Sequence, residues 1–515
     1  MEASTANAEQ TNQASAWKRI RWSGDLAILV YIACATIAVH LFAGGRYGFH
    51  RDELATLDDA RHLAWGYVAY PPITPFFGRI SLILFGTSLG GFRFFAALAD
   101  AAAVVLTGLM ARDLGGRRGA QIVAAVATIP FCLAAGSLMQ YVSFDYFFWV
   151  LTAYFVIQLL KSNDPRWWLA IGCAIGLGMM SKYAIPFLVA GLLMGVLLSS
   201  NRRYLASKWL WYGVAISLLI FLPNLLWQIR HDFISNQFLR SIHARDIRIG
   251  RTKGFLLPGQ IQLTLLAAPL WIAGLFACLF SRRWKTFRVV GWMYLTPLLL
   301  FVILKGRNYY MAGAYPMLYA AGSVWGEKLL MSFRHGRATT VRVVSWTALL
   351  LDVTVVINLT LPIAPIGSKW WNGQLRMDGD LREEFGWHEL VETVASIRDS
   401  LPAQDRAHLG VLAGNYGEAG AIDLYGPRFG LPNAISGVNS YWARGYGNPA
   451  PETLIVVGLP LSFLQNQFAS CRLAGHTWNR YGVKNEETLD HPDIFVCRGL
   501  TESWPVIWSS FRYYG

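Results

Sequence analysis

Two adjacent carboxylates follow the first long apolar segment of the chain. They are Asp52 and Glu53, in the sequence His50-Arg51-Asp52-Glu53-Leu54. A carboxylate at a membrane surface can take the proton of a hydroxyl group that attacks a substrate. Successive residues of a helix point about 100° apart, so at most one of the two acids faces the reacting atom, and the other orients an arginine or binds a cation. The alternative is an acidic first turn stabilised by the dipole of its own helix.

Charged residues also occur within and at the ends of later apolar segments. A charge in such a segment costs about 2.5–3.5 kcal/mol on insertion scales, so it marks a functional position by default. The residues of this kind, together with two tyrosines close by, are Arg93, Asp145, Lys182, Lys305, Tyr309 and Tyr310. Lysine and arginine can stabilise a phosphate leaving group by charge alone, which replaces a general acid. We therefore expect these residues to form a donor-phosphate site or pocket; the alternative for each is an interfacial anchor.

The elements that position these residues are membrane spans. The chain of 515 residues is 54% apolar and only 15% charged, whereas a soluble domain is about a quarter charged. A net charge of +14 would suggest nucleic acid in a soluble protein, but here the basic residues stand in short gaps between apolar runs. Basic residues in such gaps mark loops that face the cytoplasm. Composition thus predicts a membrane protein surrounded by lipids, with no nucleic-acid partner.

Apolar segments long enough to cross a bilayer recur about eleven times. They cover residues 25–44, 92–111, 119–137, 144–161, 166–180, 183–200, 208–227, 256–280, 287–304, 309–331 and 341–361. The two segments between 166 and 200 are short for a span. Residues 1–24 are polar, with three basic residues just before the first run. We therefore expect a cytoplasmic tail and a retained first span rather than a cleaved signal peptide.

Basic residues alternate with the spans. Every second gap is basic, through Arg112, Arg117, Arg118, Lys161, Arg166, Arg202, Arg203, Lys208, Arg282, Arg283, Lys285, Arg288, Arg334, Arg337 and Arg342. An N-terminus inside the cell satisfies the positive-inside rule, and eleven spans then place everything after Pro362 outside. The outer segment 228–254 breaks the trend with six basic residues against two aspartates. It would screen a lipid-linked phosphate or an anionic acceptor, or else contact anionic lipid headgroups.

The last part of the chain, residues 362–515, has a different pattern. Helical patterns at 384–401 and 418–425 alternate with short β-like runs at 410–413, 453–457 and 494–497, which predicts a small α/β domain. This part contains two cysteines, Cys471 and Cys497, while the other four lie within predicted spans. In an oxidising compartment the two could form a disulfide; two unlinked buried thiols are the alternative.

Several common catalytic motifs are missing from the sequence. It contains no Walker phosphate loop, no glycine-rich dinucleotide fingerprint after a strand, no zinc-type Cys/His spacing and no GxSxG. A chain without a nucleotide site fits a donor sugar that is already attached to a lipid.

A set of short motifs, spread over nearly the whole chain, carries a family resemblance. They are Tyr47-Gly48-Phe49-His50-Arg51-Asp52-Glu53-Leu54, Arg61-His62-Leu63-Ala64-Trp65-Gly66-Tyr67, Pro71-Pro72-Ile73-Thr74-Pro75, Phe92-Arg93-Phe94, Ser181-Lys182-Tyr183, Tyr309-Tyr310 and Tyr315-Pro316. With these motifs the sequence resembles the GT-C membrane glycosyltransferases, in the branch of protein O-mannosyltransferases, lipid A aminoarabinose transferases and rhizobial galacturonosyltransferases. The resemblance implies an inverting transfer, Arg and Lys near the carrier phosphate, and a catalytic acid in the first outer loop that maps onto Asp52. Ala69-Tyr70 stands where some relatives carry a Glu-Lys pair, so phosphate contacts from that position do not carry over.

These observations predict an α-helical polytopic membrane protein of GT-C type with a C-terminal extracytoplasmic α/β domain. We expect a cytoplasmic tail (1–24), a transmembrane domain (25–361) with a catalytic first outer loop (46–91), and an outer domain (362–515). The location would be the inner membrane of a bacterium. The protein would transfer a sugar from a polyprenyl-phosphate carrier to a lipid, glycan or protein acceptor.

Each candidate residue has an expected role in that transfer. Asp52 would be the base, Glu53 and Asp145 its supporters, and Arg93, Lys182 and Lys305 the phosphate or pocket cations. A divalent cation at Asp52 and Glu53 fits this scheme but is not required by it. The alternative function is a transporter or flippase of lipid-linked sugars, which should show symmetric halves and broken helices.

Overall fold

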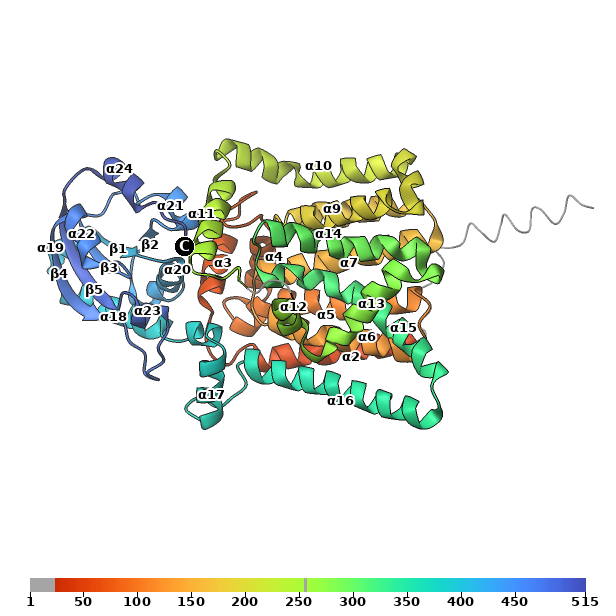
Figure 1. Cartoon of the computed structure of the whole chain (residues 1–515). Helices are drawn as coiled ribbons and strands as arrows, with labels where there is room; N and C mark the ends of the chain where they lie inside the picture. Colours follow the sequence, from red (N-terminus) through yellow and green to blue (C-terminus); the bar gives the residue numbers. More distant parts are fainter. Residues whose placement is uncertain (1–23, 254–256) are drawn as a thin grey trace, which may run out of the picture.

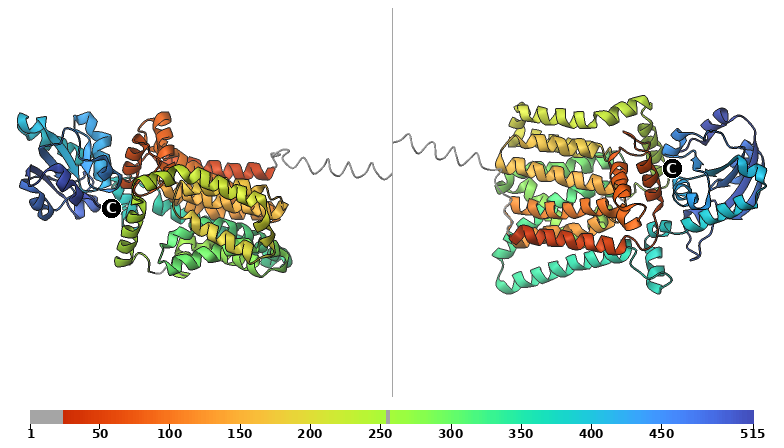
Figure 2. Two further views of the ribbon diagram at one scale, coloured as in Figure 1. Left: turned by 90° about the horizontal axis from the view of Figure 1, so that it is seen from above. Right: turned by 180° about the vertical axis from the view of Figure 1, so that it is seen from behind.

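The protein consists of a helical bundle and a smaller domain at one end of it (Figure 1). The structure, a computed structural model, describes residues 24–253 and 257–515. The predicted cytoplasmic tail lies outside these residues except for Gly24, where the first helix begins. Views from above and from behind show the bundle and the domain lying end to end (Figure 2).

The helices of the bundle follow the predicted apolar segments. Their bounds are α2 Gly24–Ala43, α5 Leu89–Asp113, α6 Arg118–Ala135, α7 Tyr141–Ser162, α8 Trp167–Met179, α9 Ile185–Leu197, α10 Lys208–Arg230, α12 Leu257–Thr264, α13 Ala268–Phe280, α14 Arg288–Ile303, α15 Tyr315–Ser332 and α16 His335–Thr360. Short 3-10 turns join several of them: η1 Ser200–Ala206, η2 Leu265–Ala267, η3 Arg282–Phe287 and η4 Asn308–Ala314.

The multi-pass architecture is confirmed, whereas the count of eleven spans stays a prediction. Within the described residues, eight helices are long and apolar enough to cross a membrane, or nine if α9 and η1, bent by 111°, form one span. The segment predicted at 166–180 corresponds to α8, which has 13 residues. Thirteen residues of helix reach only about 20 Å, less than the roughly 30 Å of a hydrocarbon core.

Small residues bring neighbouring helices of the bundle into close contact. A Cβ atom on Gly172 of α8 would collide with the backbone of Gly213 in α10. Gly274 of α13 and Gly322 of α15 make a second contact of this kind, each against the backbone of the other helix. Lipid tails are as apolar as the helices, so close backbone packing of this sort holds membrane helices together.

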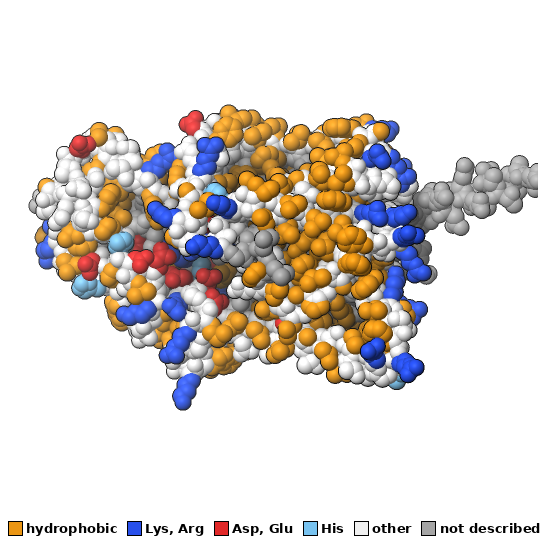
Figure 3. Space-filling view, in the orientation of Figure 1, with side chains coloured by type: hydrophobic (Ala, Val, Ile, Leu, Met, Phe, Trp, Pro, Cys, Tyr) orange, Lys and Arg blue, Asp and Glu red, His pale blue; other side chains and the backbone are white. Residues whose placement is uncertain are grey.

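Basic side chains gather at one end of the bundle. Figure 3 shows a band of Lys and Arg at the end away from the C-terminal domain, with apolar side chains covering the middle. Helices α6, α10 and α16 all begin at that end, with Arg118, Lys208 and His335 as their first residues. This is the charge distribution from which the sequence predicts the inner side.

Three helices outside the main bundle run across its other end, between it and the C-terminal domain (Figures 1 and 2). They are α3 Arg51–Arg61, α4 Ile73–Phe85 and α11 Ile234–Arg248. A capping box begins α3: the His50 side chain accepts a hydrogen bond from the Asp52 amide, and the Glu53 side chain accepts one from the His50 amide. Such a cap satisfies amides that the first turn leaves without partners. Leu54, Leu57 and Ala60 are buried at helical spacing, as the sequence predicts.

Helix α3 also packs against the C-terminal domain. Helix α20 (Tyr416–Tyr425) lies on it so closely that a Cβ atom on Gly420 would be 2.8 Å from the Leu54 backbone. Arg444 of the domain forms ion pairs with Asp58 and, at 2.6 Å, with Asp59. Near the start of α3, Arg51 pairs with Glu486. The first outer loop and the C-terminal domain are therefore held together by both packing and charge.

The C-terminal domain contains a five-stranded mixed sheet with the order β2-β1-β3-β5-β4. Its strands are β1 Leu409–Ala413, β2 Ala434–Ser436, β3 Thr453–Val457, β4 Phe468–His476 and β5 Asp493–Leu500. Strands β2, β1 and β3 are parallel, while β5 runs antiparallel to β3 and β4 antiparallel to β5. The helices are α17 Lys369–Met377, α18 Trp387–Ser400, α19 Ala403–Ala407, α20, α21 Asn439–Arg444, α22 Leu461–Gln467, α23 Glu486–Leu489 and α24 Trp504–Ile507, with turns η5 Asp380–Glu384, η6 Gly426–Phe429 and η7 Trp508–Phe511.

The α/β character of this domain is as the sequence predicts, but two strands were not predicted. Strand β2 has only three residues, and β4 is an edge strand whose side chains are mostly exposed. Neither feature produces a recognisable apolar pattern. Cys471 of β4 and Cys497 of β5 stand opposite each other in the register, and a disulfide joins them.

Candidate functional site

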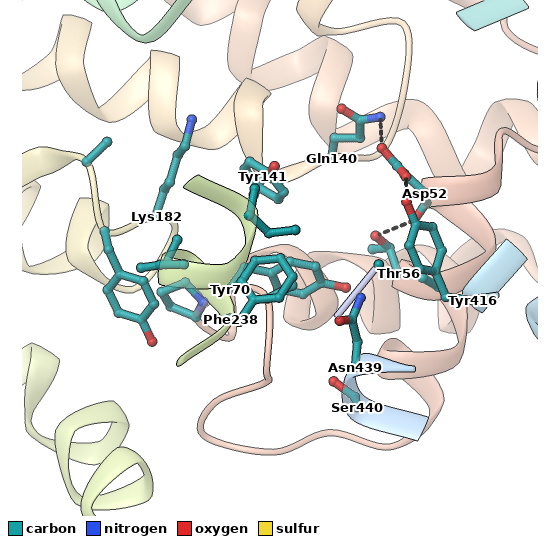
Figure 4. Close-up of a pocket in the computed structure, with 18 of the residues that line it drawn as sticks. Asp52, Thr56, Tyr70, Gln140, Tyr141, Lys182, Phe238, Tyr416, Asn439 and Ser440 are labelled. Carbon is teal, nitrogen blue, oxygen red and sulfur yellow. Dashed lines mark hydrogen bonds between the residues drawn. The ribbon is translucent and has the colours of Figure 1, made fainter. Parts of the chain in front are cut away.

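A cavity of about 380 Å³ lies where the bundle, the crossing helices and the C-terminal domain meet. We call it the Asp52 cavity. Figure 4 shows Asp52 and Lys182 on opposite sides of it, with Tyr70 and Tyr141 between them. Asp52 comes from α3, Lys182 from the turn between α8 and α9, and Tyr416 from the C-terminal domain. Residues far apart in the sequence thus enclose one space.

Asp52 presents its carboxylate to this cavity. Its side chain is 42% exposed. One oxygen accepts a hydrogen bond from the Tyr416 hydroxyl at 2.8 Å, and the other accepts one from Gln140 Nε2 at 3.1 Å. Among the described residues, no Lys or Arg side chain forms an ion pair with Asp52. A carboxylate held in place by neutral donors keeps its capacity to accept a proton.

Glu53 points away from the cavity and is fully buried. It accepts a 2.6 Å bond from Arg93 Nη2 and a 2.9 Å bond from the Met139 amide, besides capping α3. Glu53 therefore does not face the cavity, and its catalytic role stays a prediction that could act only through the residues it orients. The two adjacent acids do divide as helical geometry requires: one faces the cavity and the other orients an arginine.

Arg93 was predicted as a phosphate or pocket cation, and the structure places it elsewhere. Its guanidinium is buried between Glu53 and Glu384, 3.2 Å from the latter, and donates to the carbonyls of Gly44 and Gly48. Every one of these partners is internal, and Arg93 does not line the cavity. Burial raises the pKa of the Glu384 carboxyl to about 7, against the opposing effect of Arg93. Arg93 thus ties the first outer loop to the C-terminal domain.

Four other predicted residues do come together. Lys182 Nζ lies 3.5 Å from Asp145 and stands over the rings of Tyr309 and Tyr310, 5.1 and 4.5 Å from their centroids. Lysines bind aromatic faces at such distances by cation–π attraction. Lys182 and Tyr310 line the cavity, with Asp145 and Tyr309 beside Lys182 but outside the lining. This cluster presents the Lys182 ammonium to the cavity, with Asp145 as its ion-pair partner behind the lining. We call the cationic part of the lining the positive wall.

Lys305, the last predicted cation, does not line the cavity. It is exposed, at a turn where its φ is +50°. Arg307, two positions later, lines the cavity instead and pairs with Asp246 of α11 at 2.6 Å. The prediction was wrong by two residues because the chain leaves α14 in a turn, whose direction the sequence does not reveal.

Arginines of the basic segment complete the positive wall. Arg245 and Arg251 line the cavity together with Lys182 and Arg307. The Nε atom of Arg245 is buried without a hydrogen-bond partner, and among the described residues neither Arg245 nor Arg251 forms an ion pair. We therefore assign the contact with a phosphate or an anionic acceptor, which was predicted for segment 228–254, to these two side chains. Apolar residues of the lining lie next to them, in particular Phe187, Phe238, Leu239, Ile242 and Phe301.

Sequence reasoning did not find the polar residues that the C-terminal domain contributes. These are Tyr416, Asn439, Ser440 and Tyr441. Tyr416 belongs to the motif Gly414-Asn415-Tyr416-Gly417-Glu418, which precedes the helical pattern predicted at 418–425. No local pattern indicates that a hydroxyl 364 positions away along the chain binds Asp52.

A metal site at Asp52 and Glu53 finds no support in their placement, because the two side chains diverge. Across residues 24–253 and 257–515, no group of three or more His, Cys, Asp or Glu side chains is arranged to hold a metal ion.

Comparisons with known proteins agree with this fold. A family profile described as dolichyl-phosphate-mannose-protein mannosyltransferase matches residues 69–227. This segment runs from the middle of the first outer loop into α10. It includes Arg93 and Lys182 but not Asp52.

Two curated relatives show moderate similarity. An undecaprenyl phosphate-alpha-4-amino-4-deoxy-L-arabinose arabinosyl transferase of Pseudomonas fluorescens (strain Pf0-1) is 26% identical over 286 residues, which cover 50% of this chain and 50% of the relative. The lipid A galacturonosyltransferase RgtD of Rhizobium johnstonii is 26% identical over 246 residues, covering 45% of this chain and 49% of the relative. The chain thus matches about half the length of these curated relatives.

A solved structure matches over nearly its whole length. ArnT from Cupriavidus metallidurans, crystallised with undecaprenyl phosphate, superimposes with a TM-score of 0.55 at 14% identity, over 92% of this chain and 98% of that chain. In fold and in sequence, the chain resembles the GT-C glycosyltransferases. Within that class it resembles the family of protein O-mannosyltransferases, aminoarabinose transferases and galacturonosyltransferases.

Proposed function

We propose that this protein transfers a sugar from a polyprenyl-phosphate carrier to an acceptor hydroxyl. The observation that supports the proposal is the Asp52 cavity, whose lining combines the Asp52 carboxylate with four cationic side chains: Lys182 and Arg307, each paired with an aspartate, and Arg245 and Arg251. The transfer needs both features, since the leaving phosphate takes up negative charge while the attacking acceptor hydroxyl loses a proton.

The positive wall is the proposed site of the donor phosphate. Arg245 and Arg251 have no ion-pair partner among the described residues. The buried Nε–H of Arg245 has no hydrogen-bond acceptor, so it can donate to a bound phosphate. The adjacent apolar lining, with Phe187 and Phe301, suits the first units of a lipid chain. That a structure of the same fold was crystallised with undecaprenyl phosphate supports this choice of carrier.

Asp52 is the proposed general base. The acceptor hydroxyl would attack the anomeric carbon while the bond from that carbon to the phosphate oxygen breaks. The proton of the hydroxyl passes to Asp52, and the electron pair of the broken bond leaves with the polyprenyl phosphate. The cations stabilise the charge that develops on this phosphate, so no acid is needed to protonate it.

Inversion at the anomeric carbon follows from this arrangement. Asp52 and Lys182 stand on opposite sides of the cavity (Figure 4), so acceptor and leaving group would occupy opposite faces of the sugar. A single displacement with such geometry inverts the configuration. No metal ion is required in the scheme, since four side chains already supply positive charge, and we expect a chelator to leave the rate unchanged.

We place the reaction on the outer face of a bacterial inner membrane. The basic band in Figure 3 lies at the bundle end opposite to the Asp52 cavity, and basic ends face the cytoplasm. The transporter alternative is not favoured, because the relatives that the chain matches are named as transferases.

The proposal is tested with the purified chain in detergent. A labelled polyprenyl-phosphate sugar is mixed with an extract of envelope lipids and glycans, and the release of polyprenyl phosphate is measured together with label transfer. We expect both to rise with protein concentration and the new linkage to have inverted configuration. Movement of the donor across a vesicle bilayer without its consumption would contradict the proposal and support the transporter alternative.

A further inference from the structure

A second cavity, of about 390 Å³, lies within the C-terminal domain. Gly414, which follows β1, and Gly458, which follows β3, line it together with Gly437 beyond β2. These three parallel strands therefore end at its floor. Strand β1 leads to β2 on one side, and β3 lies on the other, so this is the switch point of the sheet. Open sheets bind their ligands at this place.

The lining of this cavity is strongly acidic, and we call it the acidic crevice. Its titratable carboxylates are Glu418, Glu486, Glu487 and Asp490. Of these, Glu486 is neutralised by Arg51. Among the described residues, Glu418 and Glu487 have no ion-pair partner, and His491 is the one nitrogen base in the lining. The crevice therefore has more acidic than basic groups, and a bound cation would favour the ionised form of its buried carboxyls.

Phosphate ligands, which usually occupy such a switch point, are excluded here by Glu418. In typical sites the free amides at a helix N-terminus bind an anion. Here the Glu418 carboxylate already accepts hydrogen bonds from the amides of Gly414 and Asn415, both at 3.1 Å. Gly458 has a φ of +68°, and a side chain there would collide with that carboxylate. The sequence thus makes room for a buried acid where an anion would otherwise bind.

Two carboxylate oxygens in the crevice lack partners. Glu418 and Glu487 are 1% and 3% exposed. Their Oε1 and Oε2 atoms, respectively, have no hydrogen-bond partner. Asn415 Nδ2 donates to the other oxygen of Glu487 at 3.3 Å, and Glu383 lies close to the same carboxyl. A buried acceptor without a partner is costly, and a bound donor with positive charge would satisfy both.

The acidic crevice adjoins the Asp52 cavity through one short segment. Asn415 and Glu418 line the crevice, while Tyr416 between them lines the cavity and bonds to Asp52. Arg51, next to Asp52 in the sequence, stands 5.0 Å from the centroid of the Tyr416 ring. The crevice and the cavity are therefore neighbouring sites, separated by the segment that holds Tyr416 against Asp52.

We propose that the acidic crevice binds a cationic amine group of the acceptor, with Glu418 and Glu487 as its ligands. The identification of the ligand as the acceptor rests on the transfer reaction proposed above. Binding of an amine in the crevice does not depend on that reaction. A neutral sugar would leave the two carboxylates uncompensated. A metal ion would need a group of ligands that the described residues do not provide.

Calorimetry on the full-length protein in detergent tests the binding. The probe is putrescine, a diamine, and the control ligand is 1,4-butanediol, its neutral counterpart of equal length. We expect putrescine to bind and butanediol not to bind. Glu487→Gln and Glu418→Gln should each weaken putrescine binding at least tenfold, since glutamine keeps the hydrogen bonds and removes the charge. The exposed Glu502→Gln, in the same domain, should have no effect.

Two further variants test folding and the location of the binding site. Asp490→Asn changes an exposed residue of the lining, so it should weaken binding even if a buried variant fails to fold. Asp52→Asn should leave putrescine binding unchanged. Equal binding of butanediol, or full affinity in all three crevice variants, would overturn the proposal.

The same probe separates this inference from the proposed function. If the chain transfers sugar, putrescine should inhibit transfer in the natural protein. Binding without any transfer reaction would leave the crevice in place and defeat the glycosyltransferase proposal. Transfer without putrescine binding would support the glycosyltransferase proposal and contradict the binding of an amine in the crevice.

Discussion

The Asp52 cavity and the acidic crevice lie on either side of the same short segment, Asn415 to Glu418, yet their charges are opposite. The lining of the cavity has four cations, two of them paired with aspartates outside the lining, and two carboxylates, of which Asp59 is paired with Arg444. The crevice has four acidic side chains, one of them paired with Arg51. Charge of one sign selects ligands of the other. The difference therefore suggests how two substrates could be told apart: a phosphate enters from the membrane side and an amine from the domain side.

The first prediction concerns the base and has the largest expected effect. Asp52→Asn keeps both hydrogen-bonded neighbours, Tyr416 and Gln140, but removes the basicity. Loss of a general base costs about 10²–10⁴-fold in rate. We expect sugar transfer to fall by that factor, measured as initial rates at saturating donor with matched amounts of folded protein. More than half of the natural rate in this variant would remove Asp52 from the mechanism.

The second prediction concerns the acid beside it. Glu53→Gln leaves the buried Arg93 with Glu384 as its remaining charged partner. Removing one member of a buried ion pair typically costs about 3–5 kcal/mol, so we expect a marked drop in thermal stability and in the yield of folded protein. The matched control is Glu384→Gln. The Glu384 pKa of about 7 means that this carboxyl is already partly neutral at pH 7, so its replacement should cost less.

An opposite ranking would change the assignment of the pair. If Glu53→Gln folds normally and abolishes transfer while Asp52→Asn is active, the catalytic acid is Glu53. The unfolding temperature and the transfer rate, measured on the same samples, distinguish a structural loss from a chemical one.

The third prediction concerns the positive wall of the cavity. Replacing Arg245 and Arg251 by Gln should raise the KM for the lipid-linked donor about tenfold, the size expected for hydrogen bonds to a charged group. The effect should shrink as salt is added, because screening weakens the same attraction in the natural protein. The matched control replaces Arg240 and Arg248, which are exposed on α11 and do not line the cavity. Equal effects of the two pairs would make the basic segment a general lipid contact.

The fourth prediction concerns the crevice and has the smallest effect. Burial, with help from Glu487, raises the pKa of Glu418 from 4.5 to about 8. Between these two values the folded protein holds a proton that the unfolded chain releases, so the free energy of unfolding falls as pH rises. We expect Glu418→Gln to flatten the decline in thermal stability between pH 5 and 8, relative to Glu502→Gln. Putrescine should flatten it in the natural protein as well, because an amine favours the ionised carboxylate.

Much of the fold was accessible from the sequence because its signals are local. The lengths of the apolar segments predicted the helices of the bundle, and the helical spacing of Leu54, Leu57 and Ala60 predicted α3. The same holds for Asp52, whose place after the first span brings it to the end of the bundle. Lys182 and Tyr310 were also found, since a charge next to an apolar run is conspicuous in any single sequence.

The errors arise where a distant partner decides the outcome. Arg93 looks like a pocket cation until Glu384, 291 positions later, takes up its guanidinium. Lys305 and Arg307 are both basic at the end of α14, and only the turn between them determines which one lines the cavity. The whole contribution of the C-terminal domain, from Tyr416 to Ser440, depends on how that domain docks. Contacts of this range leave no trace in local spacing.

The docking of α3 on the C-terminal domain has a consequence for building chimeras among related chains. Arg444 with Asp58 and Asp59, Arg51 with Glu486, and the close approach of Gly420 to Leu54 all cross this boundary. Exchange of residues 362–515 alone would separate each of these partners and remove one of the two donors to Asp52. Segment 46–91 should therefore be exchanged together with the domain, as a single cassette, even though nearly three hundred residues of bundle lie between the two in the gene.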